Sequence, residues 1–491
     1  MNSRALLIIS TALVLAGCTV GPDFHAPAPP ESATYTREGT PAATAAAQGA
    51  GGGAQIFVGA PNVPNAWWTQ FGSAALDELV DAALTASPTL DSARAKLIEA
   101  RENYNAQAGA ALFPSVDAKL SATREKIDLA SFGITAVPNP PPFTLYNASI
   151  SVSYVFDLFG ANRRALEATL AQVDYEAYEL AAARLTVAGN VVSAAVRRAS
   201  LREQITITQQ LVDAQSRQLV IMEARLAAGG VADIDVRSQR TLLAQTRATL
   251  PPLATQLAQT DHQLAVLLGV PPSSAQFQPQ LDGLTLDTLH LPGAVALTLP
   301  SSLARERPDI RAAEALLHQA SANVGVATAN LYPQITLSGS IGTERTHIED
   351  VVDGLNIWNL GFGLTQPIFH GGELHAKKRA AEAAWDAAFA DYRQTVLQAL
   401  QQVADALRAL ESDAQALQSR DEAAREAQAS ATVALARYGV GGVSEFSLID
   451  TQRQALQTAL DRTRAQADRL ADTAALYQAL GGATLPAETA R

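Results

Sequence analysis

Four stretches of the chain alternate between apolar and polar residues. The first pair covers residues 116–123 and 150–156, and the second pair covers residues 335–341 and 360–365. A period of two predicts β-strands with one apolar and one polar face. Each stretch approaches the ~9–11 residues that a tilted strand needs to cross a membrane. An amphipathic hairpin on a soluble core gives the same local pattern, so the alternation alone leaves both interpretations open.

Long stretches with a helical period follow each strand pair. In residues 385–417 apolar side chains recur at spacings of three and four, a heptad-like seam that predicts packing against a partner helix. A return arm over 446–477 has a similar register, and residues 166–180 repeat the pattern in the first half. Residues 161–225 contain no proline and a single glycine, so one helix there would reach ~100 Å. No compact domain accommodates that length.

Prolines predict where two other helices break or begin. Pro251 and Pro252 interrupt the returning arm of the first half, where we expect a kink. Pro308 lies in Arg305-Glu306-Arg307-Pro308-Asp309-Ile310 and is placed to start the next helix.

The strand and helix pattern occurs twice, which indicates a tandem repeat. Ala111-Leu112-Phe113-Pro114 corresponds to Asn330-Leu331-Tyr332-Pro333, and residues 224–231 correspond to residues 436–443. Each copy is predicted to contain a helix, a strand, a loop, a strand, a long helix, a tight turn and a second long helix. Duplication of one supersecondary unit explains this order.

The N-terminus is predicted to be a targeting segment. Arg4 precedes an apolar stretch over residues 5–15, and Leu15-Ala16-Gly17-Cys18 follows. This is the layout of a secretory signal peptide, and the tetrapeptide resembles the bacterial lipobox, in which cleavage exposes the cysteine for lipid attachment. Cys18 is the only cysteine of the chain, so we predict that it is lipidated. A chance cysteine after an ordinary signal peptide is the alternative.

These features predict five segments. Residues 1–17 form a lipoprotein signal peptide, and residues 18–64, rich in proline and glycine, form a lipid-anchored tether with little structure of its own. Residues 65–301 form the first repeat and residues 302–482 the second. Residues 483–491 form a C-terminal tail.

Charge and composition exclude several functions. The net charge of −12 argues against binding nucleic acid, which requires clustered cations. A single cysteine excludes an internal disulfide and a multi-cysteine metal centre. The seven histidines form no HExxH or other close ligand pattern, and neither a GxSxG motif nor a P-loop occurs. We therefore expect no enzymatic activity, no catalytic residue, no metal and no cofactor.

The four predicted strands have a geometric consequence. Four strands do not close a barrel, and hydrocarbon does not tolerate an open sheet edge. If the strands cross a membrane, several copies of the chain must therefore pool them. Each strand pair leads into a helical hairpin, so the assembly would be a membrane barrel continued by a helical tube. That shape conducts and suggests no covalent chemistry.

Four motifs resemble those of TolC-like outer-membrane factors, in the NodT/OprM-type efflux lipoprotein branch. The hallmark segment is Leu303-Ala304-Arg305-Glu306-Arg307-Pro308-Asp309-Ile310-Arg311-Ala312-Ala313-Glu314. The others are Trp67-Trp68-Thr69-Gln70-Phe71-Gly72, Phe156-Asp157-Leu158-Phe159-Gly160 and Gln366-Pro367-Ile368-Phe369-His370-Gly371-Gly372. The resemblance covers about residues 60 to 482 and keeps the motifs in order along a duplicated chain.

The resemblance implies a mixed, mainly α fold and an assembly. Long coiled-coil hairpins would form a periplasmic α-barrel, and four transmembrane β-strands per chain would close a 12-stranded β-barrel in a homotrimer. The family works in the outer membrane as the passive exit duct of tripartite pumps for drugs and other small toxic compounds. It docks to a periplasmic adaptor (a membrane fusion protein) and, through it, to an inner-membrane transporter of the resistance-nodulation-division (RND) type.

The hairpin tips are the candidate sites. Paired glycines allow the positive φ that reverses a helix, and the resemblance makes these turns the adaptor contact. The predicted contact residues are Ala228, Gly229, Gly230, Val440, Gly441 and Gly442. The resemblance also implies a periplasmic gate of Arg437, Tyr438, Phe446 and Asp450. Three copies of Asp450 around a threefold axis would repel unless they are screened, so small changes would bias opening. A solvated helix residue is the alternative for Asp450.

Two other functions remain open at this stage. The same fold serves as the outer-membrane duct of type I protein secretion, which exports polypeptides. A lipid-anchored coiled-coil scaffold without a pore would also show the helical pattern.

Overall fold

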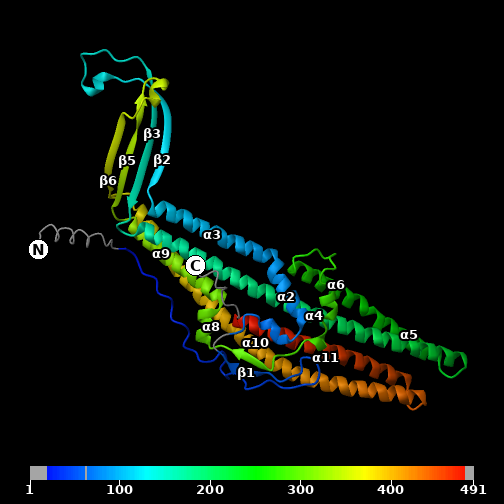
Figure 1. Ribbon diagram of the computed structural model, residues 1–491. Helices are drawn as coiled ribbons and strands as arrows, with labels where there is room; N and C mark the ends of the chain where they lie inside the picture. Colours follow the sequence, from blue (N-terminus) through cyan, green and yellow to red (C-terminus); the bar gives the residue numbers. More distant parts are fainter. Residues whose placement is uncertain (1–18, 61–62, 482–491) are drawn as a thin grey trace. The chain divides into compact units, whose positions relative to one another are not determined.

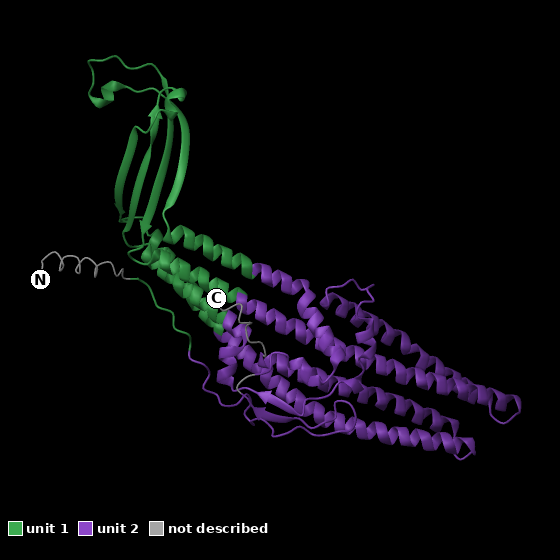
Figure 2. Ribbon diagram, in the orientation of Figure 1, with its two compact units in different colours: residues 1–27, 97–176, 313–392 green, residues 28–96, 177–312, 393–491 purple. Residues whose placement is uncertain are grey.

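A computed structural model describes residues 19–60 and 63–481 of the chain (Figure 1). The predicted signal peptide, Cys18 and the predicted C-terminal tail lie outside these residues. The chain divides into two compact units (Figure 2). Unit 1 comprises residues 1–27, 97–176 and 313–392, and unit 2 comprises the remaining ranges 28–96, 177–312 and 393–491. Both units draw on both sequence repeats, because long helices carry the chain from one unit into the other.

Unit 1 contains a four-stranded antiparallel sheet. Its strands are β2 (Ser115–Glu125), β3 (Phe143–Phe156), β5 (Gln334–Arg345) and β6 (Ile357–Thr365), in the order β2-β3-β5-β6. The four predicted strands are therefore confirmed, and each extends beyond the stretch that alternates. Strands from the two repeats meet where β3 pairs with β5.

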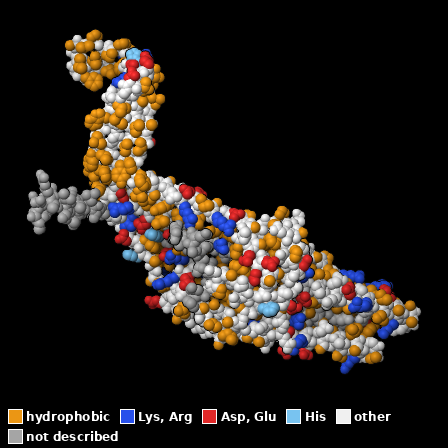
Figure 3. All heavy atoms as spheres, viewed as in Figure 1, with side chains coloured by type: hydrophobic (Ala, Val, Ile, Leu, Met, Phe, Trp, Pro, Cys, Tyr) orange, Lys and Arg blue, Asp and Glu red, His pale blue; other side chains and the backbone are white. Residues whose placement is uncertain are grey.

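The register brings the apolar residues of all four strands onto one face. Ala118 lies opposite Ile150, Ile150 opposite Ile341, and Ile341 opposite Trp358. The polar positions between them share the other face, as the period of two requires. The apolar side chains of β6 are exposed, namely those of Trp358, Leu360, Phe362 and Leu364. Hydrophobic side chains gather along the strands in Figure 3.

Two very long helices follow the strand pairs. Helices α4 (Ala161–Ala227) and α10 (Glu373–Gly439) each have 67 residues, which confirms the long helix predicted over 161–225 and the long helix predicted in the second repeat. Helix α4 contains a stretch that is long and apolar enough to cross a membrane, but 56% of it is buried inside the structure. That burial is typical of a core helix. Helices α3 (Pro88–Leu112) and α9 (Pro308–Ala329) precede β2 and β5, and Pro308 starts α9 as predicted.

The return arms lie in unit 2. The arm of the first repeat is α5 (Asp233–Ala248) and α6 (Leu250–Leu267), which meet just before Pro251 and Pro252, as predicted. Helix α11 (Glu445–Leu480) forms the arm of the second repeat. The other α-helices within residues 19–60 and 63–481 are α2 (Ala74–Ala86), α7 (Gln278–Gly283) and α8 (Pro300–Glu306). Short 3-10 helices cover Trp67–Phe71, Leu129–Phe132, Leu286–Thr288 and Ile348–Val352.

The seam predicted along α10 is buried within unit 2. Its buried members are Val396, Val403, Leu407, Leu410, Ala414 and Leu417. The seam predicted for the return arm is wrong at its start, because Phe446 is 79% exposed while Leu448 is fully buried. The seam of α11 therefore begins two residues later than the spacing predicts, since Phe446 lies in the first turn beside the tip.

The predicted tether has more structure than its composition indicates. Within unit 2, strand β1 (Ile56–Gly59) pairs in parallel with β4 (Ala294–Leu297). Arg469 of α11 is fully buried and donates hydrogen bonds to the carbonyls of Gly51 (2.9 Å) and Gly53 (2.8 Å). Main-chain carbonyls leave no hydrophobic pattern, which explains why the sequence shows no sign of this contact.

Candidate functional site

Two tight turns of the same design form the hairpin tips in unit 2. Gly229 has φ 74° between α4 and α5, and Gly441 has φ 78° between α10 and α11. Gly230 N–H donates to the Arg225 carbonyl, and Gly442 N–H donates to the Arg437 carbonyl, each at 2.8 Å. A positive φ costs glycine little and satisfies the last carbonyls of the helix. The predicted turns are confirmed in both repeats.

The residues predicted to contact an adaptor are all on the surface. Ala228, Gly229 and Gly230 are exposed in the first turn, and Val440 is 85% exposed in the second, next to exposed Gly441 and Gly442. An exposed valine between glycines gives the second tip a small apolar surface.

The four predicted gate residues lie in different surroundings. Arg437 and Phe446 are exposed, and Phe446 points away from the seam of its helix. Asp450 is half-buried and accepts a hydrogen bond from Arg453 on the same helix at 2.8 Å. Tyr438 is half-buried and contacts the first hairpin as well as the second.

A charged cluster surrounds Tyr438. The Arg225 guanidinium, at the end of α4, lies over the ring of Tyr438 at 5.7 Å from its centroid. The Tyr438 hydroxyl lies beside the Glu445 carboxylate at the start of α11, and Asp235 of α5 is close enough to act on both groups electrostatically. The cluster therefore joins both hairpins at their tips.

Burial dominates the electrostatics of this cluster. Desolvation, with the neighbouring Glu445, raises the pKa of Tyr438 to about 12. Desolvation also raises the pKa of Glu445, and Asp235 adds to the rise, while Tyr438 and Arg225 oppose it. Glu445 is only 8% exposed. A buried carboxylate beside a second carboxylate favours its neutral form, so the two hairpins are held together at an electrostatic cost.

Arg225, Asp235 and Glu445 are site residues that the sequence pattern does not predict. The repeat alignment contained one signal for them, since it places Arg225 opposite Arg437. The pairing of Arg225 with Tyr438 depends on the packing of two hairpins that are distant in sequence, so no local pattern reports it.

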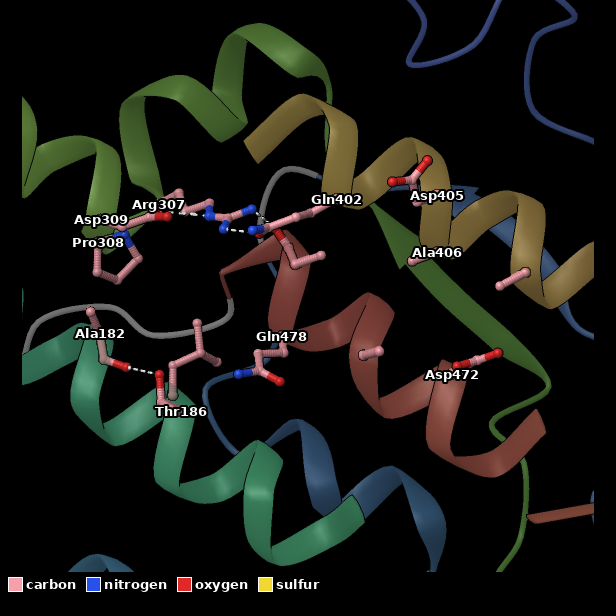
Figure 4. Close-up of a pocket in the computed structure, with 14 residues that line it drawn as sticks. Ala182, Thr186, Arg307, Pro308, Asp309, Gln402, Asp405, Ala406, Asp472 and Gln478 are labelled. Atoms are coloured by element: carbon pink, nitrogen blue, oxygen red, sulfur yellow. Dashed lines mark hydrogen bonds and ion pairs between the residues drawn. The ribbon is translucent and has the colours of Figure 1, made fainter. Parts of the chain in front are cut away.

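The hallmark segment forms a second polar site within unit 2. Arg307 is 7% exposed and donates to Asp309 and to the Ala479 carbonyl, each at 2.8 Å, and to Gln402. These residues line a cavity of about 620 Å³ between α4, α10 and α11 (Figure 4). Arg307 thus ties the end of α11 to the middle of α10, which gives this charge a positioning role.

Another motif residue packs in the same unit. Trp67 is fully buried, and its ring stacks on Tyr477 of α11 with centroids 5.6 Å apart.

In residues 19–60 and 63–481, no group of three His, Cys, Asp or Glu side chains is placed to hold a metal ion.

The fold and the sequence define a class of outer-membrane channel. OprN, an outer-membrane channel of known structure, superposes with a TM-score of 0.82 at 28% identity, covering 96% of this chain and all of that one. The family model described as "Outer membrane efflux protein" matches residues 79–270 and 299–482. The chain therefore belongs to the outer membrane efflux protein family.

Two relatives with assigned functions are similar over most of the chain. The pyoverdine export outer membrane protein OpmQ of Pseudomonas putida is 32% identical over 419 residues, 85% of this chain and 87% of that protein. The toluene efflux pump outer membrane protein TtgI of Pseudomonas putida is 29% identical and covers 96% of both chains. Both names describe outer-membrane proteins of export or efflux systems.

Proposed function

We propose that this protein is the passive outer-membrane duct of a tripartite efflux pump. Three copies of the chain would close one barrel, with an acylated Cys18 holding each copy to the membrane. The observation that carries the proposal is the sheet of unit 1, which has a continuous apolar face and an open strand at each edge.

The open edges argue for assembly. Strand β2 pairs only with β3, and β6 only with β5, among the strands that the structure describes. Each outer N–H or C=O group of these strands that stayed unpaired in hydrocarbon would cost roughly several kcal/mol of free energy. Pairing β2 of one copy with β6 of the next removes this cost, and closure requires that every copy does the same.

The two faces of the sheet support a water-filled lumen. The face opposite the apolar one carries side chains such as Lys119, Ser151, Ser338 and Asn359, at positions that alternate with the apolar residues. A transmembrane β-barrel has this arrangement, with apolar residues toward lipid and polar residues toward the channel. Exported compounds would pass through without a chemical step at this protein.

The exposed tips are the proposed docking surface for a periplasmic adaptor. Val440 and the flanking glycines present apolar surface and accessible backbone, which a helical hairpin of a partner would cover. The inner-membrane transporter, proposed to be of the RND type, would supply the energy through that adaptor. The relatives named for pyoverdine export and toluene efflux favour small molecules over polypeptides as cargo.

Paired substitutions on β6 test the membrane assignment. Leu360→Arg places a charge on the apolar face, and Asn359→Arg places the same charge one residue away on the polar face. An arginine facing lipid at mid-membrane costs about 2–4 kcal/mol. We expect Leu360→Arg to lower the amount of assembled protein in outer membranes, while Asn359→Arg assembles normally. Equal assembly of the two variants would contradict the proposal.

The cargo is tested in a deletion strain. The chain is expressed with candidate adaptor and transporter pairs, and the accumulation of drugs and solvents is measured. We expect reduced accumulation with one pair from an RND system. Export of a polypeptide with an ABC transporter, and no change in small-molecule accumulation, would instead identify a type I secretion duct.

A further inference from the structure

The segment directly after Cys18 is held in unit 1 by polar contacts that the proposed function does not use. The Val20 amide donates to the Phe159 carbonyl at 3.1 Å. Arg164 donates to the Val20 carbonyl at 3.4 Å and, through Nη2, to Asp23 Oδ1 at 2.6 Å. The Arg164 side chain is only 6% exposed, although it lies on the first turn of α4. This arginine is therefore committed to the N-terminal segment.

A second group of contacts extends the same interaction. Glu167 accepts from Arg164 Nη1 at 2.7 Å, and its other oxygen lies 2.8 Å from His318 Nε2. The His318 ring stacks on Phe24, with centroids 4.3 Å apart and planes 14° apart. Helices α4 and α9, from different repeats, thus hold residues 20–24 through one connected network.

Glycines make the close approach possible. Gly21 has φ 94°, and a Cβ there would lie 2.5 Å from the Gly325 Cα. Gly160 has φ 82°, and a Cβ there would lie 2.6 Å from Thr19 Cγ2. Nonbonded contacts this short essentially never occur at a Cβ atom, so a side chain at either position would push the segment away. Gly160 closes the Phe156–Gly160 motif, which gives this motif a specific role.

The network lies at one end of the sheet. The Phe159 ring stacks on Tyr332, with centroids 4.8 Å apart, between the end of β3 and the start of β5. Phe113, before β2, is 67% exposed, and Phe369, after β6, is 86% exposed. In an antiparallel sheet, the starts of β2 and β5 lie at the same end of the sheet as the ends of β3 and β6. Exposed aromatic residues at that end of the strands are typical of a membrane interface.

We propose that Phe159, Gly160, Arg164, His318 and Gly325 form a docking site for residues 19–24, which holds acylated Cys18 at the aromatic end of the strands. The acyl chains then enter the inner leaflet of the outer membrane beside the barrel. This inference rests on the proposed lipidation. The peptide bond to Thr19 keeps the Cys18 Cα ~3.8 Å from the Thr19 Cα. Without docking, a flexible segment over residues 19–27 would have a root-mean-square end-to-end distance of ~15–18 Å, so the anchor would not be held at one place.

Matched glycine substitutions test the docking site in the full-length protein in proteoliposomes. Gly21→Ala creates the collision with Gly325, whereas Gly39→Ala introduces the same positive-φ strain (φ 78°) with no atom within 4 Å. Chymotrypsin cleavage after Phe24, followed by mass spectrometry, reports release of the segment. We expect Gly21→Ala to be cleaved at least tenfold faster than the wild type, and Gly39→Ala to match the wild type.

A milder pair guards against misfolding of the glycine variant. Asp23 is 81% exposed, so Asp23→Asn removes the negative charge that pairs with Arg164 without disturbing a core, and Glu31→Gln is the exposed control. We expect a several-fold faster cleavage for Asp23→Asn alone. Wild-type cleavage rates in both Gly21→Ala and Asp23→Asn would overturn the docking site.

The position of the anchor is measured separately. A nitroxide on His25→Cys, read by power-saturation electron paramagnetic resonance, reports mobility and depth relative to the bilayer. We expect an immobile label near the interface, which becomes mobile and moves into water when Gly21→Ala is added. An equally mobile label in both proteins would overturn the inference. The intact mass reports acylation of Cys18 on its own, so a missing lipid is distinguished from a failed docking site.

Discussion

The Arg225 guanidinium lies over the ring of Tyr438, 5.7 Å from its centroid, and so links the end of α4 to the end of α10. The two residues come from different repeats and occupy neighbouring positions in the repeat alignment, where Arg225 corresponds to Arg437. A contact between the two hairpin tips resists any motion that separates them. In the proposed duct, opening of the periplasmic end would separate the tips, so this contact is the first place to perturb the proposed gate.

Arg225→Gln is expected to favour the open end. A cation over an aromatic ring contributes about 0.5–2 kcal/mol, which corresponds to a roughly 2–30-fold change in the ratio of open to closed channels. Single-channel recording in planar bilayers measures that ratio. Arg237→Gln is the control, because Arg237 pairs with Asp233 on the exposed surface of α5 near the same tip. Equal open probabilities for the two variants would remove Arg225 from the gate.

Asp450→Ala is expected to loosen the closed end and raise ion leakage through reconstituted trimers. The substitution frees Arg453 from its 2.8 Å ion pair and removes a ring of three carboxylates from the proposed axis. Asp461→Ala, which breaks a similar ion pair between half-buried Asp461 and Arg464 farther along α11, serves as the control. Unchanged conductance and unchanged closed-state occupancy in Asp450→Ala would assign Asp450 to the solvated surface instead.

The stability of unit 2 is expected to fall as the pH rises toward neutrality. Burial, with neighbouring Asp413 and Asp468, raises the pKa of Asp472 from 3.8 to about 7. Since the folded state binds this proton more tightly than the unfolded state, the contribution of Asp472 is most favourable below pH 4 and is lost progressively up to about pH 7. The resulting loss in the free energy of unfolding is roughly a few kcal/mol at most.

Asp472→Asn measures this contribution directly. The variant keeps the shape of the side chain but does not titrate, so we expect its melting temperature in detergent to vary less between pH 5 and pH 8 than that of the wild type. Asp461→Asn, which replaces a half-buried carboxylate of α11 that is paired with Arg464, provides the comparison. If Asp472→Asn and the wild type show parallel pH profiles, Asp472 is ionised throughout and the predicted sign is wrong.

Arg469→Leu is expected to destabilise unit 2 by about 3 kcal/mol, because it leaves buried carbonyls of the N-terminal segment without a donor. Arg469 also donates to the Thr44 hydroxyl at 2.7 Å, so the loss extends along residues 44–53. Limited proteolysis within that stretch, together with thermal unfolding, measures the effect. Arg453→Leu replaces an exposed arginine of the same helix and is expected to be nearly neutral. Similar proteolysis of both variants would contradict the role of Arg469.

Local periodicity predicted the parts of the fold that depend on one repeating interaction. The alternation around Ile150 and Ile335 identified the strands, and the seam through Leu407 and Leu410 identified α10, because each pattern follows the geometry of a single element. The glycines at 229 and 441 located the tips for the same reason, since only a positive φ reverses a helix so abruptly.

Contacts between segments that are distant in the chain could not be predicted from the sequence. The binding of carbonyls 51 and 53 by Arg469, and of Val20 by Arg164, depends on backbone groups that every residue carries. The spacing of Phe446 predicts a place in the seam, whereas its position in the first turn of α11 exposes it. Of the predicted gate residues, Tyr438 interacts with Arg225 and Asp235 of the other hairpin, and no pattern in its own hairpin predicts these partners.

Native mass spectrometry of the purified protein in detergent tests the central claim most directly. The claim is that a sheet with two open edges completes itself with identical copies. The full chain has a mass of 51.5 kDa, and we predict a complex of three copies of the mature chain that forms discrete conducting steps when it is added to a planar bilayer. A monomeric mass with no conducting steps would contradict the account.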